Sequence, residues 1–417
     1  MVKKIKTSQL KPGMYIHDLN CSWLEHPFFG RSLAIKSAVM VEKIVRFGIR
    51  EVYIDTAKGI DVDEAPSGEE AGEAKTKHAA ETNASAEQTA HEGSDEIGFK
   101  TVERAYLCTE IRKARKIREH AMETVRKVMK DIKAGNGVKK EAVEDTVDDI
   151  IVSVLRNQDA LTSLSMLRSA DEYLFNHSIS VCVLMVAFGK SLGFDPSLLK
   201  EVGVGALLHD IGTMKVSPEI LTKKSTLTDD EFEQIKSHVV NTRDILLSTE
   251  GIGEESIAMA YQHHERLDGS GYPNGLKGDE ISYIAQALAI VDVYDALTTK
   301  RCYRRKIAPT KALELIYERG GTEFNRELVQ KFIKCIGIYP VGSLVRLASG
   351  LLCIVINHNE DEMLHPIVRA IYNTKTDRCI TIPYDIDLSE EPESEEQDRI
   401  VSYEVQDDWQ VTAERYL

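Results

Sequence analysis

The sequence has few of the features that characterise secreted or membrane-spanning proteins. Its 7 cysteines are scattered over 417 residues and form no C-x-x-C pair, which excludes a disulfide framework and a zinc ribbon. No stretch approaches the roughly 18 uninterrupted apolar residues of a membrane-spanning helix, and the first residues lead into no signal-peptide core. We therefore expect a cytoplasmic protein without a membrane partner.

Positive charge is also scarce. Lys and Arg number 52 whereas Asp and Glu number 67, so the formal net charge is -15. Proteins that bind DNA or RNA gain affinity from clustered Lys and Arg side chains, so this balance argues against a nucleic-acid partner. Hydrophobic residues at 42% and charged residues at 29% are typical of a globular protein.

The acidity is concentrated in two segments. Residues 58–97 hold 11 acidic and 3 basic residues, with no Phe, Tyr or Trp and no periodic apolar face. Such a segment cannot bury enough apolar surface to offset the entropy lost on ordering, so we predict a flexible linker. Residues 385–408 hold 11 acidic residues and one basic residue, Arg399, and we predict a flexible acidic tail.

Periodicity in the rest of the chain predicts a mainly α protein. Residues 1–57 alternate between strand and helix patterns, which is typical of a small α+β domain, and we expect a regulatory role for it. Residues 136–338 are almost wholly helical, with a central buried helix expected over 175–192. Residues 339–417 predict a short β-rich C-terminal extension before the acidic tail. The expected fold is a helical bundle flanked by these two smaller parts.

A basic amphipathic helix is expected over residues 98–135, between the linker and the bundle. Its apolar positions recur at steps of three and four, and its other faces are rich in Lys and Arg. Two arrangements fit this pattern equally well. One is a parallel coiled-coil homodimer that connects the domains, and the other is a single helix that lies on its own domain.

Histidine and aspartate residues form the main chemical signal. Five of the 12 histidines lie between residues 177 and 264, each in or beside a predicted helix. An ionised aspartate in an apolar run such as 285–292 costs several kcal/mol unless a partner or a metal neutralises it. His and Asp together suit a borderline divalent cation such as Fe, Mn, Zn or Co. The candidate ligands are His177, His209, Asp210, His238, His263, His264 and Asp292.

Seven ligands are too many for one cation, so the pattern favours a dinuclear centre. Adjacent helical residues diverge by about 100°, which lets neighbouring ligands serve different ions. We expect Asp210 to bridge the ions. One ion would be held by His177, His209 and Asp292, and the other by His238, His263 and His264. Such a pair lowers the pKa of a bridging water, and two dications against two carboxylates leave a net charge of about +2 for a phosphodiester anion.

These residues resemble a known family. The run 209–212, HDIG, resembles the signature of the HD superfamily of metal-dependent phosphohydrolases. The run 263–273, HHERLDGSGYP, matches the H-H-E-x-x-D-G-x-G-Y-P block of its HD-GYP branch, and residues 295–304 are similar to the D-A-L-T-x-x-R-x-Y-R segment of that branch. The first 57 residues resemble, more weakly, a small uncharacterised domain that often precedes HD-GYP modules.

The resemblance implies a bacterial phosphodiesterase that linearises a cyclic dinucleotide second messenger. Cyclic di-GMP is the usual substrate of the family, and some members prefer 3',3'-cyclic GMP-AMP. Two divalent transition metal ions per chain, Fe or Mn, are implied, with Asp210 taking part in catalysis. Arg301 and Arg304 would hold the phosphates as forked donors.

The loop Gly271-Tyr272-Pro273 has two interpretations. Its glycine and proline residues suit a tight structural turn beside the site. The resemblance adds contact with the substrate and docking of a cyclase-domain protein partner.

Two positions depart from the family pattern. Thr213 stands where the family commonly has a lysine directly after H-D-I-G, so Lys215, two residues later, is the candidate to reach a phosphate and assist catalysis. Tyr173 stands four residues before His177, where some members carry a glutamate that binds a third metal. Because Glu172 points about 100° away on a helix, we predict two metals and not three.

Two other functions share part of this pattern. The superfamily motif also occurs in hydrolases of other nucleotides, such as phosphorylated guanosine alarmones, although the G-Y-P block argues against them. The second alternative is not an enzyme but a receptor that binds a cyclic dinucleotide without cleaving it. In that case, Thr213 would mark the loss of activity. Turnover in the presence of Fe or Mn separates the enzyme from the receptor.

Overall fold

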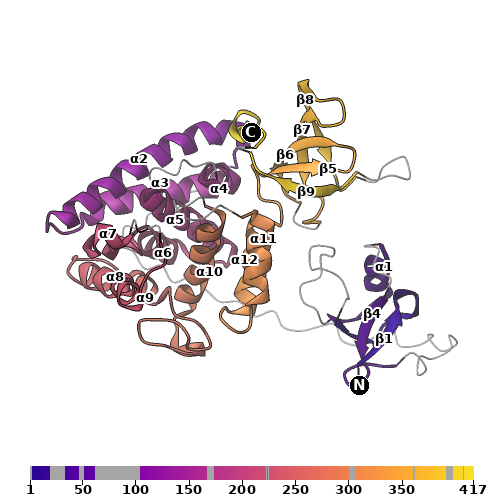
Figure 1. Cartoon of the computed structure of the whole chain (residues 1–417), viewed down its shortest axis with the longest axis horizontal. Helices are drawn as coiled ribbons and strands as arrows, with labels where there is room; N and C mark the ends of the chain where they lie inside the picture. Colours follow the sequence, from indigo (N-terminus) through magenta and orange to yellow (C-terminus); the bar gives the residue numbers. More distant parts are fainter. Residues whose placement is uncertain are drawn as a thin grey trace, which may run out of the picture. The chain divides into compact units, whose positions relative to one another are not determined.

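The structure, a computed structural model, describes residues 2–18, 33–46, 51–61, 104–166, 173–221, 223, 225–299, 307–359, 362–390, 398–406 and 408–417. The chain divides after Thr101 into two compact units (Figure 1). The first unit is small and α+β, and the second is a helical bundle with one antiparallel sheet. The predicted mainly α class is confirmed. Most of the predicted linker, 58–97, lies outside the described residues.

A four-stranded antiparallel sheet and one helix make up the first unit. The strands are β1 (Val2–Lys6), β2 (Tyr15–Asp18), β3 (Leu33–Ala34) and β4 (Glu51–Asp55), in the order β1-β4-β2-β3, and the helix is α1 (Ala38–Arg46). Val52 and Ile54 alternate with exposed or half-buried residues of β4 and are fully buried. They share a core with Ile44 of α1, so one face of the sheet is covered by the helix.

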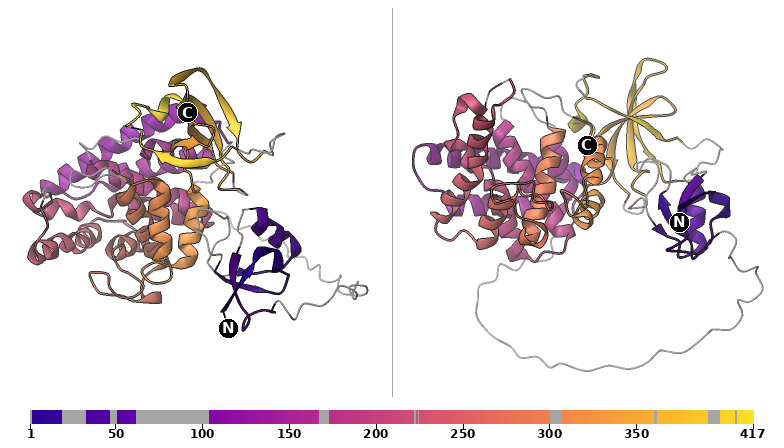
Figure 2. Two further views of the ribbon diagram at one scale, coloured as in Figure 1. Left: turned by 45° about the vertical axis from the view of Figure 1, so that its right-hand side comes forward. Right: turned by 60° about the horizontal axis from the view of Figure 1, so that its bottom comes forward.

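The second unit is built around a central helix. Its helices are α2 (Leu107–Lys133), α3 (Lys140–Arg156), α4 (Gln158–Met166), α5 (Tyr173–Ser191), α6 (Pro196–Leu208), α7 (Pro218–Leu221), α8 (Asp229–Leu247), α9 (Glu254–Gln262), α10 (Tyr283–Thr298), α11 (Pro309–Glu318) and α12 (Arg326–Ile336). As predicted, α5 is apolar on all faces, and it packs against α2, α3, α4, α6, α10 and α12. The helices of this unit gather into one bundle (Figure 2). Leu174–Ser191 is long and apolar enough to cross a membrane, but 78% of this window is buried inside the fold, as in a core helix.

Side-chain caps set the starts of three of the five helices that carry the candidate ligands, α6, α8 and α10. Asp195 accepts two backbone N–H groups in the first turn of α6, and Ser282 accepts the N–H of Ala285 at the start of α10. Thr228 and Glu231 form a reciprocal capping box at the start of α8. These caps satisfy N–H groups that have no partner within the helix, so each helix begins at a defined residue.

The basic helix α2 lies on its own domain. Its apolar stripe, including Ile111, Ala121, Val125 and Val128, is buried, and α2 packs against α3, α4 and α5. The stripe that a parallel coiled coil would need is therefore already covered within the chain. Of the two arrangements expected for residues 98–135, the structure has the single helix packed on the bundle, and the helix begins at Leu107.

A five-stranded antiparallel sheet follows the bundle. Its strands are β5 (Leu344–Leu347), β6 (Leu351–Asn357), β7 (Ile367–Asn373), β8 (Arg378–Asp387) and β9 (Ile400–Glu404), in the order β8-β7-β6-β5-β9. The prediction of a flexible tail over 385–408 was wrong for its described residues. Residues 400–404 pair with β5, and Trp409 and Tyr416 pack against the sheet with Leu352 and Ile354. Apolar residues between the acidic ones give this segment surface to bury.

Candidate metal centre

The seven candidate ligands come from five parts of the bundle. Three lie within helices, and four directly follow helix ends. The positions are His177 in α5, His238 in α8, Asp292 in α10, His209-Asp210 after α6 and His263-His264 after α9. The C-terminal end of a helix carries partial negative charge, so the ends of α6 and α9 favour a cation here.

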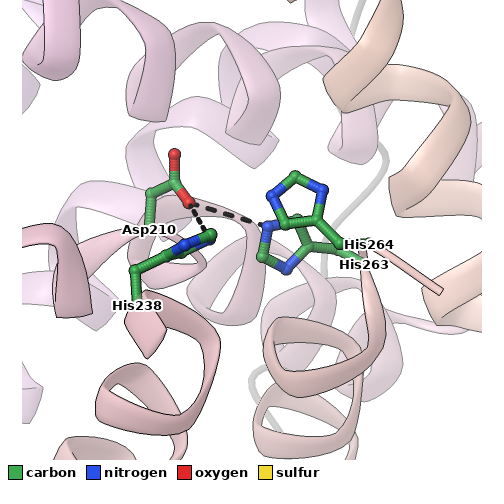
Figure 3. Close-up of side chains that lie close together, drawn as sticks. All are labelled: Asp210, His238, His263 and His264. Carbon is green, nitrogen blue, oxygen red and sulfur yellow. Dashed lines mark ion pairs between the residues drawn. The ribbon is translucent and has the colours of Figure 1, made fainter. Parts of the chain in front are cut away.

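Asp210, His238, His263 and His264 form one group, in which one ligand atom of each lies within 4.8 Å of the others. Asp210 points between His238 and His263 (Figure 3). Its Oδ1 atom is 3.2 Å from Nε2 of His238 and 3.6 Å from Nε2 of His263. The rings of His263 and His264 lie side by side, with their centroids 4.0 Å apart.

His177, His209 and Asp292 form a second group by the same distance criterion, and all three residues are buried. Oδ1 of Asp292 is 3.1 Å from Nε2 of His177 and 3.9 Å from Nε2 of His209. Two nitrogen atoms and one carboxylate oxygen thus converge on one point. The structure therefore brings all seven candidate residues into two adjoining groups that are able to hold metal ions.

Asp210 faces both groups. While its Oδ1 atom belongs to the first group, its Oδ2 atom is 3.7 Å from Nε2 of His177 and 3.5 Å from Nε2 of His209. Asp292 spans the groups more loosely, since its Oδ2 atom is 3.9 Å from Nδ1 of His264. A carboxylate with one oxygen directed toward each group has the geometry of a bridging ligand.

Three of the imidazole rings are oriented by the same local hydrogen bond. Nδ1 of His209, His238 and His263 lies 2.8, 2.6 and 2.8 Å from the carbonyl oxygen three residues earlier. A carbonyl oxygen only accepts, so each Nδ1 is the protonated nitrogen and donates to it. Each Nε2 atom then carries the lone pair, which is the tautomer that binds a metal.

These Nε2 atoms point toward the carboxylates of the centre. Within the described part of the chain, Nε2 of His209, His238 and His263 and Oδ1 of Asp210 are buried without a hydrogen-bond partner. Each such atom costs roughly 1–3 kcal/mol when left unsatisfied. Three of them converge in the first group and Nε2 of His209 lies in the second, so they fit bound cations that they would coordinate. Imidazole nitrogen and carboxylate oxygen are also the donors that suit Fe, Mn and Zn.

The charges of the centre hold its carboxylates ionised. Burial raises the pKa of Asp210, but the neighbouring His209 and His238 outweigh burial and keep that pKa well below its usual range. Burial lowers the pKa of His177, but hydrogen bonds to Asp292 and Asp295 raise it to about 10. Burial lowers the pKa of His209 to about 4, so this ring is neutral. Metal binding would release the proton on His177.

Asp295 is a functional residue that the site prediction left out. It is 1% exposed, and its Oδ2 atom lies 2.7 Å from Nδ1 of His177, so the ring donates to this carboxylate. It thus does for His177 what a backbone carbonyl does for the other rings. The available signal was its position three residues after Asp292 in an apolar helix, which places both carboxylates on one helix face.

Gly212 of the HDIG run lets α8 approach the centre. A Cβ atom at this position would lie 2.2 Å from the carbonyl oxygen of His238 and 2.4 Å from the N atom of Thr242. The N–H of Gly212 donates to Oγ1 of Thr242 at 2.9 Å. The glycine therefore allows the backbone after Asp210 to touch the turn that carries His238.

The loop 271–273 closes one side of the centre. The Tyr272 ring lies 4.7 Å from the His264 ring between centroids, and its N–H donates to the carbonyl oxygen of His264. Glu265, which is 2% exposed, accepts the backbone N–H groups of Asn274 and Leu276, directly after the loop, at 2.7 and 3.0 Å. Glu265 therefore holds the loop against the centre, a role that the sequence did not suggest.

The remaining predicted residues are not brought to the centre by the described contacts. Arg301, Arg304 and Glu172 lie outside the described residues. Lys215 is exposed and makes no ion pair with the two groups in the part of the chain that the structure describes. Thr213 is buried, and its hydroxyl donates to the carbonyl oxygen of Asp210 at 2.7 Å, so it closes the turn after the aspartate.

Comparison with known proteins agrees with this site. Residues 162–328 match the HD domain family, and residues 2–143 match a domain of unknown function, DUF3391. The cyclic di-GMP phosphodiesterase PA4108 of Pseudomonas aeruginosa is 35% identical over 411 residues, which cover 98% of this chain and 94% of that protein. This chain belongs to the HD-GYP family. The resemblance noted in the sequence, including the small N-terminal domain, is confirmed.

Other related proteins match a smaller part of this chain. The 3'3'-cGAMP-specific phosphodiesterase 3 of Vibrio cholerae is 33% identical over 168 residues, which are 40% of this chain and 36% of that protein. Among solved structures, the HDG"Y"P protein Bd1817 from Bdellovibrio bacteriovorus covers 80% of this chain and 98% of its own, with a TM-score of 0.46 and 15% identity.

Proposed function

We propose that this HD-GYP protein is a metal-dependent phosphodiesterase that hydrolyses a cyclic dinucleotide, either cyclic di-GMP or 3',3'-cyclic GMP-AMP, to the linear dinucleotide. The similarity to a cyclic di-GMP phosphodiesterase over the full chain supports the first substrate. The shorter similarity to a cGAMP-specific phosphodiesterase supports the second. In the reaction, a water molecule gives a hydroxyl group to phosphorus and a proton to the departing ribose oxygen, and the phosphorus–oxygen bond to that ribose breaks.

The observation that carries this proposal is that the two carboxylate oxygens of Asp210 face different ligand groups. One oxygen faces His238 and His263, and the other faces His177 and His209. We assign one divalent transition metal ion to each group, with Fe or Mn as the expected metals, and Asp210 as the residue shared by both. When bound, such a pair supplies Lewis-acid activation of water and positive charge for the phosphodiester.

The protein's own residues orient the ligands and receive the substrate. Backbone carbonyls orient His209, His238 and His263, and Asp295 orients His177, so the Nε2 atoms of these rings point inward before any metal binds. We assign the substrate side to the loop 271–273, to Arg301 and Arg304, and to Lys215. Burial raises the pKa of Tyr272, so its phenol remains neutral beside the phosphate.

We place this activity in the cytoplasm. Cys108, Cys182, Cys335, Cys353 and Cys379 are free thiols in the described part of the chain. Free thiols on both exposed and buried positions are typical of proteins in a reducing compartment.

The test is metal analysis together with a substrate panel. Purified protein is expected to hold about two transition metals per chain and to convert cyclic di-GMP or 3',3'-cyclic GMP-AMP to products that chromatography resolves, with cyclic di-AMP as the third nucleotide. His209→Ala and Asp210→Ala should abolish turnover. His120→Ala is the matched control, because this histidine is exposed on α2. Full activity in metal-free protein would exclude the proposal, and binding of the nucleotide without turnover would indicate a receptor.

A further inference from the structure

An exposed aromatic side chain lies beside the metal centre. Phe232, in the first turn of α8, is 46% exposed. Its ring packs edge-to-face on Tyr272, with the centroids 6.4 Å apart and an interplanar angle of 77°. The structure therefore keeps an aromatic surface accessible at the rim of the site.

Phe232 is separated from a candidate metal ligand by a single ring. Tyr272 lies 4.7 Å from His264 and 6.4 Å from His238 between ring centroids, and Phe232 contacts the side of Tyr272. A phosphodiester held at the metal centre would place the adjoining nucleoside within reach of this rim. The ribose between phosphate and base spans a distance comparable to that of one aromatic ring.

The rim also carries positive charge. Nζ of Lys236 lies 4.9 Å from the Phe232 ring centroid and 5.7 Å from the Tyr272 ring centroid. Lys236 also pairs with the exposed Glu233. Because surface ion pairs of this kind contribute little, the ammonium group can be drawn to an anion at small cost. An aromatic surface with a cation beside it suits a nucleotide, which combines a flat base with a charged phosphate.

We infer that Phe232 is the stacking surface for one nucleobase of the cyclic dinucleotide, with Lys236 supplying positive charge beside it. This inference rests on the proposed function and adds a substrate-binding residue from α8 to the loop 271–273. Phe232 touches the base and not the reacting phosphorus. Its loss should therefore weaken substrate binding and leave the hydrolytic step intact.

The test compares Phe232→Ala with the wild-type enzyme on two substrates. For the cyclic dinucleotide, KM should rise by about 5- to 150-fold, the range that loss of one base–aromatic stack produces. The value of kcat should change by less than about twofold. Turnover of methyl 4-nitrophenyl phosphate, a small diester without a nucleobase, should be unchanged. Phe232→Tyr keeps the ring and should restore a KM near the wild-type value.

Tyr283→Ala is the matched control, because Tyr283 is 44% exposed and begins α10, and its removal should leave KM unchanged. An unchanged KM in Phe232→Ala, in an enzyme whose wild type hydrolyses the dinucleotide, would overturn this inference and leave the proposed function standing. Equal losses on both substrates would also overturn it, since they would show a general disturbance of the centre. Wild-type protein that cleaves the small diester and no cyclic dinucleotide would overturn both claims.

Discussion

At the scale of single residues, the centre depends on how each imidazole ring is held. His209, His238 and His263 are fixed by the carbonyl oxygen three residues earlier, which is a local contact within the same helix or at its end. His177 lies inside α5, and its Nδ1 atom is directed at a side chain instead. Its orientation therefore depends on a carboxylate from another helix, Asp295.

Asp295→Asn should weaken the metal centre without emptying it of ligands. The amide keeps the size of the side chain but loses the charge that holds the His177 ring and supports its basicity. We expect metal affinity or activity to fall by about 10- to 100-fold, the usual effect of removing such a partner. Metal affinity is measured by calorimetric titration of the metal-depleted protein with Mn²⁺. Asp145→Asn, an exposed aspartate of α3, is the control. Equal affinity in the two variants would contradict this role.

Sequence reasoning reached the seven candidate ligands but not the residues that support them. The candidate ligands are recognisable because histidine and aspartate are the residue types that bind divalent metals, and because several of them are adjacent in the sequence. Asp295 was visible only through its spacing from Asp292 and as part of a family motif, and its contact with His177 was not, since the two residues lie 118 positions apart in the sequence. Glu265 acts on backbone N–H groups, which have no signature of their own in the sequence.

At the scale of helices and strands, the centre requires an unusually close approach. The turn after Asp210 touches the backbone of α8 at Gly212, where a side chain would collide with the carbonyl oxygen of His238 and the N atom of Thr242. Both atoms belong to the helix backbone, so neither can move aside as a flexible side chain would. The relative position of these two elements sets the distance from Asp210 to His238.

Gly212→Ala should therefore damage both stability and the site. The added methyl group must push α8 outward, and overpacking of this kind costs about 1–3 kcal/mol. We expect a thermal midpoint lower by several degrees, together with loss of metal binding, because His238 moves with α8. Gly137→Ala is the matched control, since no atom lies within 4 Å of its added Cβ. A Gly212→Ala protein with wild-type Tm and metal content would contradict this account. Calorimetry and metal analysis provide the two measurements.

The predictions of helices and strands were correct where the apolar pattern was strong. They were ambiguous where either of two surfaces could cover the same apolar stripe. The all-round apolar run of α5 predicts a buried helix, because no exposed face remains. The apolar stripe of α2 predicts that this face is buried, but not which part of the protein covers it. In the structure, α3, α4 and α5 cover it. The acidic composition of 385–408 hid the apolar residues of β9, such as Ile400, which is packed against the sheet.

At the scale of the whole molecule, the centre joins distant parts of the bundle. Its ligands extend from His177 to Asp292 and come from α5, α8, α10 and the ends of α6 and α9. These elements pack on one another through apolar contacts, and the ligand atoms meet where the elements converge. Metal ions held there would link five segments that are separate in the sequence.

Removal of the metals should consequently lower the thermal stability of the protein. A ligand whose free concentration is 1,000 times its dissociation constant stabilises the folded state by about 4.1 kcal/mol. Removal of the metals by a chelator should therefore reduce Tm by several degrees. The shift is measured by differential scanning calorimetry before and after dialysis against a chelator. In His238→Ala the shift should be much smaller, whereas in His120→Ala it should match the wild type. A Tm that is insensitive to chelation in the wild-type protein would argue against metals in the centre.

The sequence by itself determined the chemical identity of the site and the class of each region. Residue types, adjacent pairs and periodicity are local properties, so they identify seven candidate metal-binding side chains, their division into two groups about Asp210, a buried central helix and a small α+β domain. Only the tertiary structure decided how close the side chains of each group lie, that the two oxygens of Asp210 face different groups, and that Asp295 holds His177. These facts depend on distances between residues far apart in the chain, and packing of complete helices sets those distances.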